Sequence, residues 1–292
     1  MRILHFSDPH LTSPLSQLRP GDWFSKRIVG VLSVLRGRTS RFEQAEQKLA
    51  ALAEFSREQE IELVICTGDY TAVGLDAEFA DARRAVDPLM HCKEGYFTVP
   101  GNHDLYVPEV VRQRRFNQDF GSVLGSDLPE YCVDGPWPQV RLIGNDLALV
   151  AVNSARPNLL WRSIGMIPEA QLASLDELLD DERLAGRFII VITHYAVRMP
   201  DGNPDTRLHG LVNGEDFLSV CSKIDRGALL CGHVHHRYQV AIDGLNTDLF
   251  CAGSATMESR ESFWMYELAE GQLNAYPGYW EDGAYRVDLW AG

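Results

Sequence analysis

The sequence predicts an α/β protein, because short apolar runs that suit buried strands alternate with segments whose apolar residues follow helical spacing. A third observation supports this class: polar residues gather where the predicted strands end, as they do in open α/β sheets. The chain has 292 residues, of which 45% are hydrophobic and 23% charged, an ordinary balance for a globular protein. We interpret residues 1–292 as one domain in which outer helices cover two packed sheets.

The first half of the chain begins with the apolar run Arg2–Ser7, which predicts a buried strand. A helix follows over about 42–55, and Ser40 with Glu43 is typical of a capping box at its start. Beyond this helix we expect a strand over 62–67, a helix over 76–90 and a strand over 96–99. Strands and helices therefore alternate along this half, as in an α/β fold.

The second half continues the pattern and then changes to strands. We expect strands over 148–153, 188–193 and 228–231. Pro168 suits the first residue of a helix that runs to about Arg183, and Asn213 suits the cap of a helix that runs to Lys223. The C-terminal part, 236–292, is rich in strand-forming residues, with turns at Asp243-Gly244 and Glu270-Gly271.

A basic and apolar insertion occupies residues near 20–41. Its apolar residues are Trp23, Phe24, Ile28, Val29, Val31, Leu32, Val34 and Leu35, and its basic residues are Lys26, Arg27, Arg36, Arg38 and Arg41. We expect a helical hairpin packed on the core. The alternative is an amphipathic segment, 23–41, that lies peripherally on the inner face of a membrane.

Charge and cysteine usage limit the class of partner and the compartment. The formal net charge of -14 repels the phosphate backbone, which argues against a long nucleic acid and against a nuclease. The six cysteines form no CxxC pair, and we interpret them as reduced thiols. The N-terminus lacks the layout of a signal peptide and no apolar run approaches 18 residues, so we expect a cytoplasmic protein.

Five short polar motifs each follow a predicted strand directly. In chain order they are Asp8-Pro9-His10, Gly68-Asp69-Tyr70, Gly101-Asn102-His103-Asp104, His194 and Gly232-His233-Val234-His235. Each motif alone is a weak signal, since a Gly-Asp pair is usually a turn and a single histidine is usually structural. Five motifs at the same position relative to a strand favour a site over coincidence. The glycines let the chain turn tightly just before the polar residue.

The motifs supply candidate metal ligands. The donors are Asp8, His10, Asp69, Asn102, His194, His233 and His235. Imidazole and carboxylate together suit borderline divalent metals, and seven donors are too many for one tetrahedral ion. We therefore expect two adjacent divalent ions, with the carboxylate of Asp69 as the central candidate for a bridge. The ligand types do not distinguish Mn, Fe and Zn.

This ordered series resembles the calcineurin-like metallophosphoesterase superfamily, and within it the bacterial single-domain branch that includes phosphodiesterases. The resemblance implies a four-layer α/β/β/α sandwich with two mixed sheets. It implies that Asp8, His10, Asp69 and His235 hold one metal, and that Asp69, Asn102, His194 and His233 hold the other. It further implies two catalytic residues: His103 faces the substrate phosphate, and Asp104 orients His103.

The resemblance implies a phosphoesterase in which two cations activate a water molecule that attacks the ester. We expect a small phosphodiester substrate, either similar to a cyclic nucleotide or linked to a lipid. One alternative is a phosphomonoesterase or protein phosphatase, since such members carry extra arginines near the site. Arg112, Arg114, Arg115 and Arg162 are present, but no motif ties them to it. An alternative of another class is a non-catalytic scaffold that binds protein partners.

Residues outside the motifs are weaker candidates. The loop after His194 can overhang the site, so Arg207 and His209 are candidates for substrate contact. His5 lies within the first strand, where we expect a core histidine with satisfied hydrogen bonds. An aromatic cluster near the C-terminus favours strand packing or a homodimer contact. Its members are Tyr276, Tyr279, Trp280, Tyr285 and Trp290.

Overall fold

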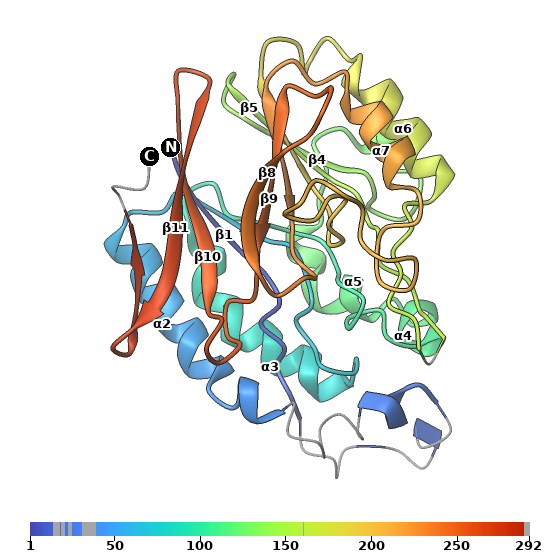
Figure 1. Ribbon diagram of the computed structural model, residues 1–292, viewed down its shortest axis with the longest axis vertical. Helices are drawn as coiled ribbons and strands as arrows, with labels where there is room; N and C mark the ends of the chain where they lie inside the picture. The colour runs from blue at the N-terminus through green and yellow to red at the C-terminus, as the bar shows by residue number, and fades with distance from the viewer. Residues whose placement is uncertain (14–17, 19–20, 23–24, 31–38, 160, 289–292) are drawn as a thin grey trace.

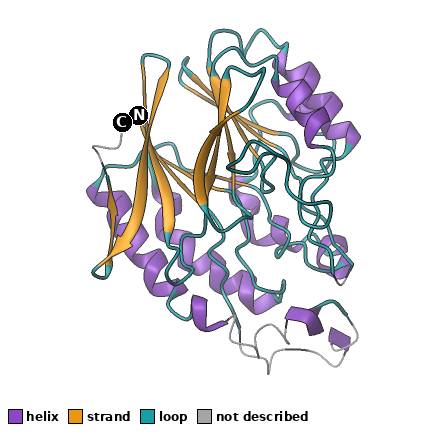
Figure 2. Ribbon diagram, viewed as in Figure 1, coloured by secondary structure: helices purple, strands orange, loops and turns teal. Residues whose placement is uncertain are grey.

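Two mixed β-sheets form the middle of the molecule, and helices lie on their outer sides (Figure 1, Figure 2). The structure is a computed structural model, which describes residues 1–13, 18, 21–22, 25–30, 39–159 and 161–288. The α/β class, the two mixed sheets and the layered α/β/β/α arrangement predicted from the sequence are confirmed.

The first sheet joins the N-terminal strands to the C-terminal ones. In spatial order its strands are β12 (Ala284–Val287), β11 (Gln272–Glu281), β10 (Ser262–Ala269), β1 (Arg2–Phe6), β2 (Leu63–Cys66) and β3 (Tyr96–Thr98). The last three pair in parallel, whereas β10, β11 and β12 run antiparallel to their neighbours. Three polar motifs therefore follow parallel strands and leave the sheet at the same edge.

The second sheet has a parallel centre and antiparallel borders. In spatial order its strands are β4 (Gln139–Ile143), β5 (Leu147–Ala151), β6 (Phe188–Ile192), β7 (Gly227–Cys231), β9 (Thr247–Ala252) and β8 (Arg237–Ala241). Strands β5, β6, β7 and β9 run parallel, and β4 and β8 close the two sides antiparallel. The two remaining motifs follow β6 and β7.

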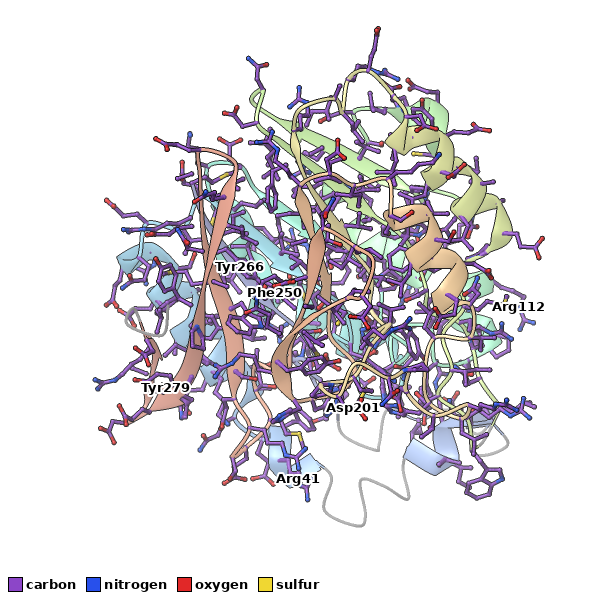
Figure 3. All side chains as sticks on the ribbon, turned by 45° about the horizontal axis from the view of Figure 1, so that its top comes forward. Arg41, Arg112, Asp201, Phe250, Tyr266 and Tyr279 are labelled. Atoms are coloured by element: carbon purple, nitrogen blue, oxygen red, sulfur yellow. The ribbon has the colours of Figure 1, made fainter. Side chains whose placement is uncertain are left out.

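Alternating side chains of the second sheet contribute to two different cores. On β6, Phe188, Ile190 and Ile192 pack between the sheets, whereas Ile189 and Val191 pack beneath the helices on the outer face. Figure 3 shows the contact between the two sheets at Phe250 of β9 and Tyr266 of β10, whose ring centroids are 5.3 Å apart. Because both faces of β6 are buried, its sequence is a continuous apolar run.

Helices pack mainly on the outer faces. The first sheet is covered by α2 (Ala45–Glu58), α3 (Asp76–Val86) and the 3-10 helix η4 (Asp87–His91), and the second by α6 (Glu169–Leu179) and α7 (Gly214–Cys221). The shorter helices are α4 (Pro108–Arg112), α5 (Arg115–Phe120), η3 (Thr39–Phe42), η5 (Gly121–Val123) and η6 (Pro129–Tyr131). The sequence did not predict α4, α5 or the edge strand β4.

The predicted capping box at Ser40 and Glu43 is wrong. Helix α2 begins at Ala45, after the 3-10 helix η3, and its cap residue Gln44 makes no side-chain hydrogen bond to the helix. The carboxylate that does serve a helix start is Glu78 of α3. It accepts the backbone N–H groups of Val73 (2.9 Å) and Leu75 (3.1 Å). A local motif therefore indicated a helix start a few residues too early.

The insertion near 20–41 is described only in part. Trp23, Phe24, Val31, Leu32, Val34, Leu35, Arg36 and Arg38 lie outside the described residues. Within the described part, the guanidinium of Arg27 is buried and donates to the carbonyl oxygens of Val73 (3.2 Å) and Gly74 (2.7 Å), and it pairs with Asp22. Arg27 was expected among the basic residues that flank the apolar stretch. Its hydrogen bonds instead connect the insertion to the loop between β2 and α3.

Five members of the predicted aromatic cluster lie near the C-terminus, and one of them, Trp290, lies outside the described residues. All six cysteines are free. Tyr285 is buried, and its ring packs edge-on against Phe263 and Trp280. None of the helices over the described residues has the length and apolarity that crossing a bilayer requires.

Candidate metal centre

The five motifs meet at one end of the two sheets. Asp8 and His10 follow β1, Asp69 follows β2, Asn102 and His103 follow β3, His194 follows β6, and His233 and His235 follow β7. Contacts between the sheets demonstrate this: the Nε2 atom of His235 lies 3.0 Å from Oδ1 of Asp8. The structure therefore brings together all seven residues predicted as metal ligands.

The backbone is left-handed at most of these residues. The positive φ angles are 52° at Asp8, 44° at His10, 63° at Asp69, 71° at His233 and 54° at His235. Side chains other than glycine avoid this region because Cβ crowds the backbone, at a cost of about 1–2 kcal/mol per residue. Such conformations persist where the surrounding structure enforces them, and they gather at functional sites. Gly68, immediately before Asp69, has a φ of 97°, which glycine adopts without this cost.

One donor group consists of Asp8, His10, Asp69 and His235, whose donor atoms lie within 4.8 Å of one another. The Nε2 atoms of His10 and His235 are 3.0 Å apart. Two ligands that each bind one ion at about 2.1 Å stand about 3.0–3.4 Å apart, so this spacing suits a shared cation. Oδ1 of Asp8 is buried and faces the same two ring nitrogens, at 3.6 Å from Nε2 of His10 and 3.0 Å from Nε2 of His235, so it lies within this donor group.

A second donor group combines Asp69, His194 and His233, again within 4.8 Å. Oδ1 of Asn102 lies 3.1 Å from Nε2 of His194, which adds a neutral oxygen. Asp69 belongs to both groups through one atom: its Oδ2 lies 3.7 Å from Nε2 of His10 and 3.5 Å from Nε2 of His194. Its other oxygen accepts the backbone N–H of His103 at 2.7 Å. That bond holds the carboxylate with Oδ2 between the two groups.

Backbone carbonyls determine which ring nitrogen of each histidine faces the site. The contacts join Nδ1 of His10 to Thr71 (3.1 Å), Nδ1 of His194 to Thr67 (2.7 Å) and Nε2 of His233 to His209 (3.1 Å). A carbonyl oxygen only accepts, so each of these ring nitrogens donates a proton. The opposite nitrogen then carries a lone pair directed at the donor groups. This is the usual outer support of a metal-binding histidine.

Burial and charge keep these groups in the form that binds metal. Burial lowers the pKa of His194, and it lowers the pKa of His233 well below its usual value, so both imidazoles stay neutral. For Asp8, burial acts to raise the pKa, but the nearby rings of His235 and His10 outweigh it and hold the pKa well below its usual range. Neutral imidazoles and ionised carboxylates are the forms that coordinate cations. The donor set therefore fits divalent metal ions.

His103 lies beside the donor groups. Its Nδ1 donates to the carbonyl oxygen of Ala72 at 2.5 Å, and its ring stacks on Tyr106 with centroids 5.3 Å apart. The ring also packs edge-on against His10, at 4.8 Å between centroids. These contacts fix the ring plane and put the proton of the neutral imidazole on Nδ1.

The resemblance implied that Asp104 orients His103. The buried carboxylate of Asp104 accepts the backbone N–H groups of Asp69 (2.9 Å), Thr71 (3.0 Å) and Gly101 (2.9 Å). Burial raises the pKa of Asp104 to about 6, against the opposing effect of these amides. The turn after β2 passes next to the imidazole of His103, and the carbonyl of Ala72 in that turn accepts the proton of Nδ1. Asp104 thus ties the turn after β2 to the turn after β3.

Two glycines permit the close approach of the motifs. A Cβ atom at Gly101 would collide with the carboxylate of Asp69, and one at Gly232 would collide with the side chains of Ser7 and Asp8. The sequence interpretation assigned these glycines to tight turns. The structure shows that the space is taken by side chains from other strand ends, Asp69 beside Gly101 and Ser7 and Asp8 of the opposite sheet beside Gly232, which a single sequence cannot reveal.

A cavity of about 580 Å³ opens over the donor groups. The predicted residues in its lining are Asp69, Asn102, His103, His209, His233 and His235. The lining also includes three cationic side chains that the sequence analysis did not assign to the site: Lys26, Arg162 and Arg260. Lys26 comes from the insertion, where its basic character was noted but its target was not. Arg162 was noted among arginines without a link to the site, and the structure supplies that link.

Arg207 and His209, in the loop after His194, were the predicted candidates for substrate contact, and one of the two lines the cavity. His209 lines the cavity, stacks on His233 with centroids 4.1 Å apart, and its Nδ1 lies 2.5 Å from Oδ2 of Asp205. Arg207 is exposed and lies outside the cavity lining. Arg112 lies at the outer edge of the molecule (Figure 3), also outside the lining.

The fold and its donor groups define an α/β protein that presents ligands for divalent cations at the shared end of two sheets. The chain belongs to the calcineurin-like phosphoesterase family, whose family model matches residues 1–237. No protein of curated function matches the sequence.

Solved structures share the fold at low sequence identity. The chain is similar to a dimetal phosphatase from Danio rerio, with a TM-score of 0.62, 16% identity and coverage of 94% of each chain. It is also similar to a purple acid phosphatase from seeds of yellow lupin (Lupinus luteus), with a TM-score of 0.61 and 12% identity. That match covers 98% of this chain and 52% of the lupin protein. At these identities the similarity establishes the fold.

Proposed function

We propose that the protein hydrolyses a small phosphate ester, preferably a diester, at the two donor groups. The observation that carries the proposal is the position of Asp69, whose Oδ2 lies between His10 and His194 at the base of the cavity. Two divalent cations bound here would hold the phosphoryl oxygens and lower the pKa of a water molecule. Asp8, His10, Asp69 and His235 would hold one cation, and Asp69, Asn102, His194 and His233 the other.

His103 supplies the proton chemistry in this proposal. Hydrolysis forms a P–O bond from water and breaks the P–O bond to the leaving alcohol, whose oxygen must gain a proton. Because Nδ1 of His103 donates to the carbonyl oxygen of Ala72, Nε2 is the ring nitrogen that would carry and release that proton. General acid catalysis of this kind contributes about 10²–10⁴-fold.

The size of the cavity supports an ester with organic groups beyond the phosphate. Its volume of about 580 Å³ falls in the range of about 300–1,000 Å³ that is typical of sites for whole organic ligands. A diester places such a group on each side of phosphorus. The second candidate is a monoester, and the observation in its favour is the cationic lining by Lys26, Arg162 and Arg260. A dianionic monoester gains more from those charges than a monoanionic diester does.

The deciding experiment compares bis(p-nitrophenyl) phosphate with p-nitrophenyl phosphate in Mn²⁺, with His103→Ala as the control. We expect faster hydrolysis of the diester, with the activity lost in the control. Faster hydrolysis of the monoester would favour the second candidate function, a phosphomonoesterase, over a phosphodiesterase. A metal-loaded protein that hydrolyses neither ester would overturn the proposal and favour the non-catalytic scaffold.

A further inference from the structure

An exposed apolar rim borders the cavity. We define the rim as Leu159, Trp161, Leu208 and Val212, whose exposed fractions are 76%, 82%, 57% and 61%. Scattered exposed leucines are normal on a protein surface, but four exposed apolar residues on two loops beside a ligand cavity indicate a binding surface. Trp161 and Leu208 also line the cavity itself.

The two loops that carry the rim are hydrogen-bonded to each other. Ser163 donates its N–H to the carbonyl of Leu208 (2.9 Å), and Val212 donates to the carbonyl of Gly165 (2.9 Å). The amide of Asn158 donates to the carbonyl of Ile164 (3.0 Å) and closes the first loop. The backbone that carries these apolar side chains is therefore held in place on the side of the cavity, which lowers the entropic cost of binding a ligand.

The polarity of the cavity changes from its base to its mouth. Asp69 and the other donors lie at the base, the cations Lys26 and Arg162 lie in the lining, and Trp161 and Leu208 are the exposed part. Lys26 is held in place by its Nζ, which donates to the carbonyl of Arg162 at 3.2 Å and lies 4.8 Å above the ring of Tyr106. An anionic head with an apolar chain matches this order of surfaces.

Building on the function proposed above, we propose that the substrate is an amphiphilic phosphate ester whose apolar chain lies on Trp161 and Leu208 while its phosphate binds at the donor groups. The net charge of -14 opposes two other occupants of the rim, a second copy of the chain and an anionic lipid surface. A single substrate molecule meets no such repulsion, because the cationic lining attracts its phosphate. Covering the rim also removes exposed apolar surface from water.

The test measures kcat/KM in Mn²⁺ for p-nitrophenyl alkyl phosphodiesters from methyl to hexyl, all below their micellar concentrations. A fully buried methylene would raise kcat/KM about fourfold, and on this open rim we expect about twofold for each added methylene. Hexyl should therefore exceed methyl by about thirtyfold. Trp161→Ser should reduce this ratio to a few-fold. Val133→Ser is the matched control, since Val133 is 50% exposed and does not line the cavity, and it should keep the wild-type ratio.

Each other outcome overturns a distinct claim. A series that is flat with chain length, in an enzyme active on the methyl ester, overturns the amphiphilic substrate and leaves the phosphodiesterase proposal intact. No hydrolysis of the methyl ester overturns the proposed function itself. A flat series with a dimer that Trp161→Ser dissociates identifies a second copy as the occupant. If the series is flat, the hexyl ester is measured again above its micellar concentration, and acceleration only there identifies a lipid surface.

Discussion

The partner of the second ring nitrogen distinguishes a candidate metal-ligand histidine from a structural one. His5 is buried, and its nitrogens bond the hydroxyls of Tyr266 (3.0 Å) and Thr67 (3.1 Å), as its position within a strand predicted. Burial lowers the pKa of His5 to about 3. His10 is equally buried, but it bonds a backbone carbonyl with one nitrogen and turns the other toward His235. Sequence position after the strand, rather than burial, is what separates the two.

Replacing His103 by alanine should lower kcat by about 10²–10⁴-fold while metal content stays near the wild-type value. The reason is that His103 supports Asp69 with its backbone N–H, which alanine retains, and only the ring is lost. The measurement is turnover of the chromogenic diester alongside metal analysis of the purified protein. Loss of metal from this variant would show that the ring belongs to the metal centre instead.

Replacing Asp69 by asparagine should remove both metal and activity. The amide oxygen can still accept the N–H of His103, but an NH₂ group then takes the place of the oxygen between His10 and His194. An NH₂ group is a poor ligand, so the two sites lose their common donor. Metal analysis and diester turnover, measured on the same preparation, check this. A variant that stays loaded and active would contradict the bridging role.

At the scale of elements, strands that are buried on both faces were predicted from the sequence, whereas an edge strand and two short helices were not. Strands β2, β6 and β7 are buried on both faces, so their sequences are continuous apolar runs. The edge strand β4, with the sequence QVRLI, mixes polar and apolar residues and was not predicted. Helices α4 and α5 have five and six residues, too few to show helical periodicity.

Helix ends were less predictable because capping side chains serve tertiary contacts. Asn213 does precede α7, as predicted, but its side chain makes no bond to that helix. It bonds the backbone N–H and carbonyl of Ile167, in the segment before α6. The candidate site follows the same rule: ligands placed by strand ends were predicted, whereas Lys26 and Arg260 reach the cavity from loops whose path only the structure reveals.

Glu78 at the start of α3 should make stability depend on pH. Burial raises the pKa of Glu78 from 4.5 to about 7, against the opposing amides of Val73 and Leu75. Between these values the folded protein holds a proton that the unfolded chain releases, so the free energy of unfolding falls as pH rises from about 4.5 to 7. The loss amounts to about 3 kcal/mol.

Glu78→Gln isolates this contribution, because glutamine keeps an oxygen for both amides and cannot titrate. Urea unfolding at pH 4.5 and pH 8 should show a smaller fall in stability for the variant than for the wild type. Equal falls in both proteins would mean that Glu78 is already ionised across this range and that the amides of Val73 and Leu75 outweigh its burial.

At the scale of the whole molecule, the donor groups join the two sheets. Asp8 and Asp69 extend from the first sheet, and His194 and His235 from the second, so each proposed cation would connect both. The unfolded chain separates these residues by up to 227 positions in sequence (235 − 8) and has no such site. Cations should therefore bind the folded state in strong preference, and binding linked to folding stabilises it.

Metal removal should consequently lower the thermal stability of the entire protein, not only its activity. With Mn²⁺ at about 100 times its dissociation constant, the linkage contributes about 2.7 kcal/mol. For a chain of this size that amounts to a rise of about 5 °C in Tm. Thermal unfolding of chelator-treated protein, before and after Mn²⁺ is restored, measures the shift. Asp69→Asn should show almost none, whereas Glu78→Gln, which leaves the centre intact, should show the wild-type rise. An equal rise in Asp69→Asn would place the stabilising ion elsewhere, and the two sheets would then be held together by their apolar core alone.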